Sequence, residues 1–209
     1  MTDVVCTGRH ATWARRWPAI ATMLIFAVVA VANVVWVYEY RRALPLDVDE
    51  AGYLGFAFDD LRGLRGGLGI LFDTVVGQRQ FGPLVPLTAA PLLGVFGENT
   101  QVAMAVQVVF LAVLTFASYG LGARLAGRGA GVVSACVVLL APGVLDFSRT
   151  FHFVIAPTAL LALAVWALVA SDGLARRGLV VTAGIAVGLL LLARTYAVAF
   201  LPGLARTFQ

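Results

Sequence analysis

The stretch that decides the fold is Trp17-Pro-Ala-Ile-Ala-Thr-Met-Leu-Ile-Phe-Ala-Val-Val-Ala-Val-Ala-Asn-Val-Val-Trp-Val-Tyr38, which contains no charged residue. A helix that crosses the hydrocarbon core of a bilayer needs about 20 mostly apolar residues. A secretory signal peptide is the alternative, with Arg15 and Arg16 as its basic region and Ala30-Val-Ala32 as a cleavage site. The apolar run is longer than a signal peptide needs, so we predict a retained transmembrane helix.

The composition of the whole chain agrees with this first segment. Of the 209 residues 61 % are hydrophobic and 12 % are charged, and the mean hydropathy is +0.93. Soluble domains are about 45–50 % apolar and about 25 % charged. The predicted fold class is therefore all-α, a polytopic transmembrane helix bundle embedded in a lipid bilayer.

Five segments have the length and composition of transmembrane helices. They are residues 17–38, 100–122, 129–145, 151–170 and 178–193. Residues 195–209 read as the start of a sixth segment, so we expect one membrane domain that forms the N-terminal part of a longer protein.

The arginines predict the orientation of the chain. All 15 basic residues are arginine, and short loops rich in arginine lie on the cytoplasmic side. The residues that satisfy this rule are Arg9, Arg15, Arg16, Arg124, Arg128, Arg176 and Arg177. Residues 1–16 then form a cytoplasmic tail in a multi-pass protein of the cell membrane, and residues 39–99 form an extracytoplasmic loop. These arginines are scattered and form no basic stripe, which argues against nucleic acid as a partner.

The outer loop is expected to contain two short helices at the membrane surface. Residues 50–64 read as one helix with aromatic anchors. Residues 83–96 are apolar but too short and rich in proline to cross the membrane, so a helix lying along its outer surface is expected. Four glycines, at positions 63, 66, 67 and 69, are expected to loosen the chain between them.

Three carboxylates lie close together soon after the first apolar segment, in the run Asp47-Val-Asp49-Glu50. Clustered acids raise one another's pKa, which suits a general base or a set of metal ligands. A solvated helix start is the simpler alternative, because acids are favoured in the first turn of a helix. Asp47 and Asp49 also spell Asp-x-Asp, a pattern that can hold a divalent metal, but three residues are a weak motif. We expect no metal or other cofactor.

The order of these features resembles the N-terminal part of the GT-C superfamily of membrane glycosyltransferases. The nearest branch contains protein O-mannosyltransferases and the lipid A aminoarabinose transferase, which carry an acidic pair in the first outer loop. The matching stretches are Asp49-Glu50-Ala51-Gly52-Tyr53, Gly82-Pro83-Leu84, Phe96-Gly97-Glu98, Ser148-Arg149 and Leu191-Leu-Ala-Arg194-Thr195. The resemblance covers nearly the whole chain, although each motif is short.

The resemblance implies transfer of a sugar from a polyprenyl-phosphate-linked donor to a lipid, glycan or protein acceptor outside the cytoplasm. Asp49 is then the expected base on the acceptor hydroxyl, with Glu50 as a supporting group. The expected partners of the leaving phosphate are Arg194, Arg149, His152 and Arg79. A transporter fragment and a non-catalytic assembly protein remain as alternatives.

Two departures from the family pattern limit what can be carried over. Gln80-Phe81 stands where the aminoarabinose branch has a Glu-Lys pair, which argues against aminoarabinose as the sugar. Val154 and Ile155 stand near the place of an acid that is frequent after the third helix.

Overall fold

The computed structural model describes residues 8–78, 82–194, 199 and 202–203, with side chains from residue 17 onward. Every regular element in these residues is helical, which confirms the all-α prediction. In chain order they are α1 (Gly8–Glu39), the 3-10 turn η1 (Arg41–Ala43), α2 (Val48–Gly66), α3 (Leu68–Gly77), α4 (Leu84–Phe96), α5 (Thr100–Met104), α6 (Gln107–Ala126), α7 (Arg128–Leu140), α8 (Pro142–Phe147), α9 (Ile155–Ala170) and α10 (Arg177–Ala193).

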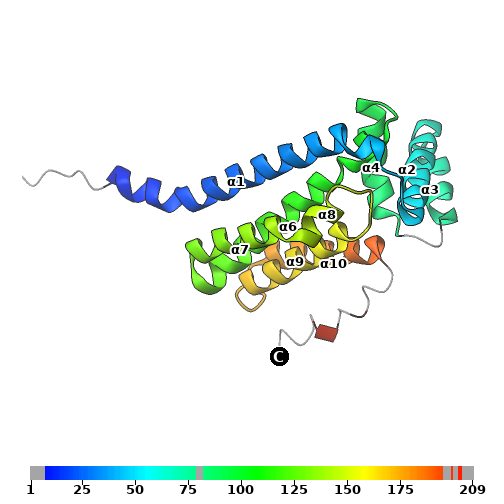
Figure 1. Ribbon diagram of the computed structural model, residues 1–209. Helices are drawn as coiled ribbons and strands as arrows, with labels where there is room; N and C mark the ends of the chain where they lie inside the picture. Colours follow the sequence, from blue (N-terminus) through cyan, green and yellow to red (C-terminus); the bar gives the residue numbers. More distant parts are fainter. Residues whose placement is uncertain (1–7, 79–81, 195–198, 200–201, 204–209) are drawn as a thin grey trace, which may run out of the picture.

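The long helices share one direction, and the short helices gather at one end (Figure 1). Helix α6 packs against α7 and α9, and α9 packs against α10, while α1 crosses the bundle on the α7 side. Helices α2, α3 and α4 lie at the end of α1 that is remote from the N-terminus. The start of α9 and the end of α10 lie at this same end, so we call it the loop end and the opposite one the tail end.

Close packing within the bundle depends on glycine. A Cβ atom on Gly120 of α6 would lie 2.2 Å from the indole nitrogen of Trp166 in α9. A Cβ atom on Gly131 of α7 would lie 2.7 Å from the carbonyl oxygen of Tyr119. Small residues at such contacts allow helix backbones to approach closely, as they do in membrane helix bundles.

Two stretches are long and apolar enough to cross a membrane, residues 17–43 and 100–126, each of 27 residues. The remaining bundle helices are shorter than the predicted segments, with 13 residues in α7, 16 in α9 and 17 in α10. A span needs about 20 residues when it lies perpendicular to the bilayer. The structure therefore supports membrane association through two helices.

Several predicted boundaries were wrong for identifiable reasons. The segment predicted over 129–145 stops at Leu140, because the proline at 142 disfavours helical geometry at Ala141, which is extended. The segment predicted over 151–170 becomes helical only at Ile155. The backbone amide of Phe151 donates to a side chain of α2 instead of joining a helix.

The first two predicted segments are parts of longer helices. Helix α1 starts at Gly8, inside the predicted tail 1–16, and continues one residue past the predicted end at 38. The segment predicted over 100–122 runs on to Ala126 and is interrupted between α5 and α6. The predicted sixth segment, 195–209, falls almost wholly outside the described residues.

The predicted loop of residues 39–99 holds three helices, one more than expected. The helices predicted over 50–64 and 83–96 are present as α2 and α4, and α4 packs its buried face against α2. The stretch expected to be loose contains α3, which folds back onto α2 after Gly67, whose φ of +115° suits glycine. Gly63 allows the close approach, since a Cβ atom there would lie 3.0 Å from the Cα of Leu71.

Candidate functional site

Asp47 starts α2. Its side chain accepts a hydrogen bond from the amide of Val48 at 2.6 Å, and it forms a reciprocal capping box with Glu50. This arrangement satisfies backbone N–H groups that have no partner within the helix. The simpler interpretation of the acidic cluster, a helix start, is therefore right for Asp47.

Glu50 is buried, and both of its carboxylate oxygens have partners. One oxygen is ion-paired with Arg41 of η1, which is itself 7 % exposed. The other oxygen accepts a 2.8 Å hydrogen bond from the backbone amide of Phe151. The Arg41 guanidinium also donates to the carbonyl oxygens of Leu44 and Pro45, at 3.2 and 3.0 Å. Glu50 therefore joins the end of α1, the start of α2 and the segment before α9.

Asp49, the neighbouring carboxylate, is exposed at the same helix start. It lies close enough to Tyr53 and Arg194 for their charges to interact. Burial raises the pKa of the Tyr53 hydroxyl to about 12, with Arg194 acting to lower it and Asp49 to raise it. Burial lowers the pKa of the Arg194 guanidinium, while Tyr53 and Asp49 act in the opposite direction. The structure thus brings Asp49, the predicted base, and Arg194, one of the predicted phosphate partners, into one neighbourhood.

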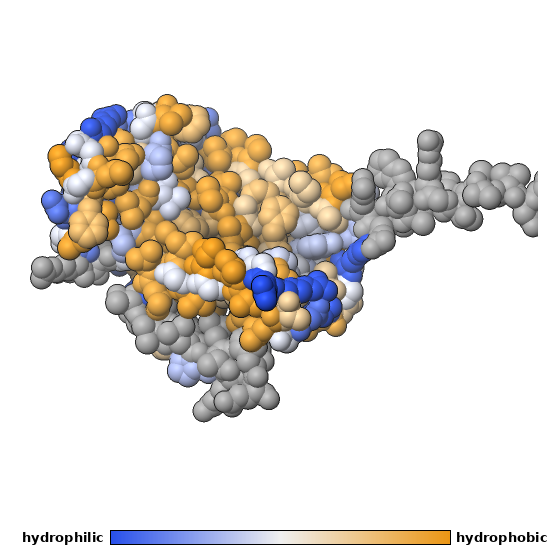
Figure 2. Space-filling model, turned by 180° about the vertical axis from the view of Figure 1, so that it is seen from behind, coloured by the Kyte–Doolittle hydropathy of each residue, from blue (hydrophilic) through white to orange (hydrophobic). Residues whose placement is uncertain are grey.

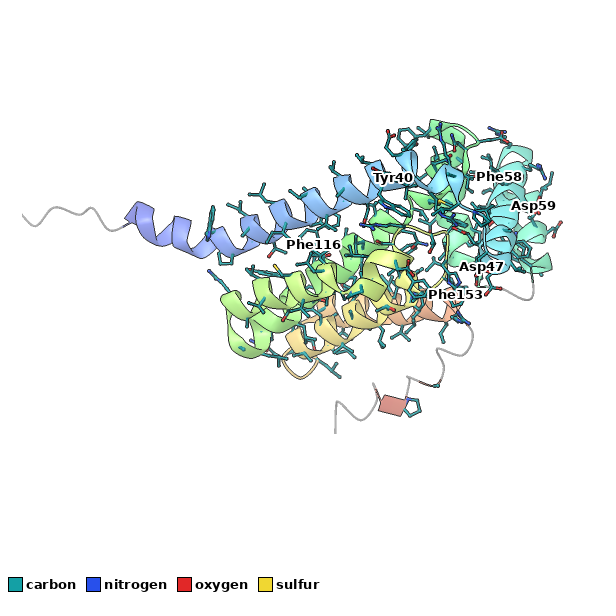
Figure 3. The ribbon with its side chains drawn as sticks, viewed as in Figure 1. Tyr40, Asp47, Phe58, Asp59, Phe116 and Phe153 are labelled. Atoms are coloured by element: carbon teal, nitrogen blue, oxygen red, sulfur yellow. The ribbon has the colours of Figure 1, made fainter. Side chains whose placement is uncertain are left out.

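Aromatic rings form the floor of this neighbourhood. The Arg194 guanidinium carbon lies 3.3 Å from the centre of the Phe153 ring, a cation–π arrangement. Phe153 also contacts Tyr53 and His152, with ring centres 5.5 and 4.2 Å apart. In Figure 3 Phe153 and Asp47 are both labelled at the loop end, where α2 meets the bundle. Of the predicted site residues, His152 and Arg194 therefore both contact Phe153, and Asp49 interacts with Arg194 through its charge.

Arg149 belongs to a different set of contacts at the loop end. Its Nε donates to Asn33 Oδ1 at 2.8 Å, and its guanidinium lies 5.0 Å from the Trp36 ring of α1. Asn33 also donates to Ser148 Oγ at 2.8 Å. Arg149 is thus anchored to α1, whereas Arg194 lies over Phe153. Arg79, the fourth predicted phosphate partner, lies outside the described residues.

Among the described residues four amide side chains are buried, all missed by the sequence reasoning, and two of them contact predicted site residues. Asn33, near the C-terminal end of α1, bonds to Ser148 and Arg149 as described above. Gln107, at the start of α6, donates to the carbonyl oxygen of His152 at 2.6 Å. The signal was present in the sequence, because a polar side chain in an apolar helix needs an internal partner.

An apolar groove of about 380 Å³ lies between α1, α4 and the α5–α6 region. Its lining residues are Val34, Tyr38, Leu92, Phe96, Val102, Ala105, Val108 and Val109. None of these residues belongs to the surface around Asp49. The groove suits a hydrocarbon chain better than a sugar.

The side chains present at the site suit proton transfer and anion binding. Within the described ranges, no three His, Cys, Asp or Glu side chains come together as metal ligands. Asp47, half of the Asp-x-Asp pattern, has an oxygen engaged in helix capping. Asp49 presents a solvated carboxylate that can accept a proton, and Arg194 carries a positive charge that interacts electrostatically with it.

No known protein family, curated protein or solved structure matches this chain.

Proposed function

We propose that this chain is a membrane glycosyltransferase of the GT-C type, or the N-terminal part of one. It would move a sugar from a polyprenyl-phosphate donor to an acceptor on the extracytoplasmic side. The observation that carries the proposal is the exposed Asp49 carboxylate beside Arg194, on an aromatic floor at the loop end. A base and a cation next to each other are what an inverting sugar transfer needs.

The proposed reaction assigns a role to each group. The Asp49 carboxylate takes the proton of the acceptor hydroxyl as that oxygen attacks the anomeric carbon. The bond from the anomeric carbon to the phosphate oxygen breaks, and polyprenyl phosphate leaves with the bonding electron pair. Arg194 stabilises the charge that grows on the phosphate, since its planar guanidinium matches two phosphate oxygens.

Glu50 has a positioning role in this proposal. Its bonds to Arg41 and to the Phe151 amide hold Asp49 and Phe153 at fixed positions relative to each other. Tyr53 and Phe153 offer ring faces on which a sugar can stack. The acceptor hydroxyl binds next to the Asp49 carboxylate.

The proposal also specifies the membrane arrangement. Helices α1, α6, α7, α9 and α10 cross the cell membrane, the N-terminus is cytoplasmic, and the loop end faces outward. Tilting accommodates the two 27-residue stretches, whereas local thinning of the bilayer and snorkelling of flanking arginines accommodate the shorter helices. The donor's prenyl chain then lies in lipid, with its phosphate at the surface where Arg194 lies.

The decisive experiment is Asp49→Asn in the full-length protein, assayed for sugar transfer from a labelled polyprenyl-phosphate sugar. Loss of a general base typically slows a reaction by about 10²–10⁴-fold. Asp59→Asn is the matched control, because Asp59 lies on the same helix and its side chain is 49 % exposed in a surface ion pair with Arg62. Unchanged transfer in Asp49→Asn would rule out Asp49 as the base.

Topology can be tested without knowing the substrate. Cys6 and Cys136 are replaced by serine, and one new cysteine is placed at Ala51 of the loop end or at Gly129 of the tail end, both exposed. A membrane-impermeant thiol reagent on intact cells should label the cysteine at 51 and spare the one at 129. The reverse pattern would place Asp49 in the cytoplasm and remove the basis for an extracytoplasmic transferase.

A further inference from the structure

The tail end of the bundle carries a concentration of arginine. Arg124 lies in the last turn of α6, Arg128 starts α7, and Arg176 and Arg177 precede or start α10. Hydrophilic residues gather at this end in Figure 2, beyond an apolar body. Among the side chains that the structure describes there, Asp172 is the one acid, so these five groups have a net charge of +3.

Two of the four arginines share one carboxylate. One oxygen of Asp172 is ion-paired with Arg124, and the other is ion-paired with Arg176 at 2.7 Å. Arg124 comes from the last turn of α6 and Arg176 from the N-cap of α10, and their side chains remain 49 % and 62 % exposed. A guanidinium has five N–H donors, so the contacts with Asp172 leave donors that face solvent.

The turn that supplies Asp172 has a well-defined backbone. Ser171 is fully buried; its hydroxyl donates to the Leu168 carbonyl at 2.7 Å and accepts from the Leu174 amide at 3.2 Å. Asp172 and Leu174 adopt positive φ angles of 52° and 71°, which are uncommon for residues other than glycine. Hydrogen bonding within the turn therefore fixes where the Asp172 carboxylate lies.

Exposed leucines flank the arginines. Leu125 follows Arg124 and is 71 % exposed, and Leu174 precedes Arg176 and is 45 % exposed. Apolar side chains beside cations are typical of surfaces that lie where lipid headgroups meet acyl chains. The leucines can enter the apolar layer while the guanidinium groups remain at the level of the phosphates.

We propose that Arg124 and Arg176, held together by Asp172, form with Arg128 and Arg177 a binding site for the headgroups of anionic phospholipids. Charge complementarity identifies the occupant, since a site with a net charge of +3 favours lipids with net negative charge over zwitterionic ones. The guanidinium fork also matches phosphate oxygens. This site lies at the opposite end of the bundle from Asp49 and does not depend on sugar transfer.

The test uses the purified full chain in mixed micelles with equal amounts of phosphatidylglycerol and phosphatidylcholine, with bound lipid measured by native mass spectrometry. Wild type should retain phosphatidylglycerol preferentially. The attraction of one arginine to an anionic surface corresponds to roughly a fivefold preference. The double variant Arg124→Gln/Arg176→Gln should therefore lower the preference by about 25-fold.

The control variant also removes two positive charges, but at the loop end. In Arg62→Gln/Arg65→Gln, two exposed arginines lose ion pairs with acids, as they do in the test variant, and lipid preference should be unchanged. Arg177 takes no part in the two ion pairs of Asp172, so Arg177→Gln removes one charge without breaking them. It should lower the preference for phosphatidylglycerol roughly fivefold. Equal retention of both lipids by wild type, or equal loss in the loop-end control, would overturn the proposal.

Discussion

The buried ion pair between Arg41 and Glu50 leads to a sharp prediction about stability. In Glu50→Gln the amide oxygen can still accept from Phe151, but the positive charge of Arg41 loses its partner at a site where the arginine is 7 % exposed. Breaking a buried pair by removing one partner costs about 3–5 kcal/mol. Glu50→Ala also removes the acceptor for the Phe151 amide, which adds about 1–3 kcal/mol.

The assay is thermal unfolding of the purified chain in detergent, followed by intrinsic fluorescence. For a chain of this size about 1 kcal/mol shifts Tm by about 2–4 °C, so Glu50→Gln should lower Tm by at least about 6 °C. Glu98→Gln is the control, because Glu98 makes a comparable pair with Arg65 at a half-exposed position. Such a pair contributes about 0–1 kcal/mol. If the two variants lowered Tm equally, the structural role assigned to Glu50 would be wrong.

Two further predictions concern pH and helix packing. Burial raises the pKa of the Asp60 carboxyl to about 6, so the folded chain binds a proton more tightly than the unfolded chain. Stability should therefore increase as pH falls from 7.5 to 5, and Asp60→Asn should raise Tm at pH 7.5 and flatten this dependence. Asp59→Asn should weaken the dependence only slightly, because the Asp59 charge contributes less than burial to the raised pKa of Asp60. Gly120→Ala should destabilise the bundle by about 1–3 kcal/mol in the same unfolding assay, because the new methyl group would overlap Trp166. Gly129→Ala meets open space within a helix and should be neutral or slightly stabilising; equal losses in the two glycine variants would contradict the packing.

The helical class was predictable because it depends on bulk hydrophobicity, whereas the boundaries depend on contacts between distant residues. Phe151 looks like the start of an apolar helix in the sequence, but its amide is taken by Glu50. Helix α3 was missed because its glycines suggested a loose chain. Gly63 and Gly67 instead allow a tight turn and a close approach to Leu71.

The candidate site was predictable only in part. Adjacent carboxylates at a helix start look alike in a sequence, yet Glu50 is buried in an ion pair and Asp49 is exposed. Which of the two faces inward depends on where Arg41 and Phe151 lie, and local sequence does not contain that information. The neighbourhood of Asp49 and Arg194 likewise requires the folded arrangement of α2 and α10. The catalytic role of Asp49 stays a prediction.

The carboxylate of Glu50 also sets an order of events during synthesis. Its ion pair with Arg41 joins residues 9 apart and can form as soon as α2 emerges, whereas its bond to Phe151 joins residues 101 apart. At about 5–20 residues per second, the second partner is made about 5–20 s after the first contact is available. During that interval one oxygen of the Glu50 carboxylate has no protein partner, and six more helices, α3 to α8, are made before Phe151 supplies it.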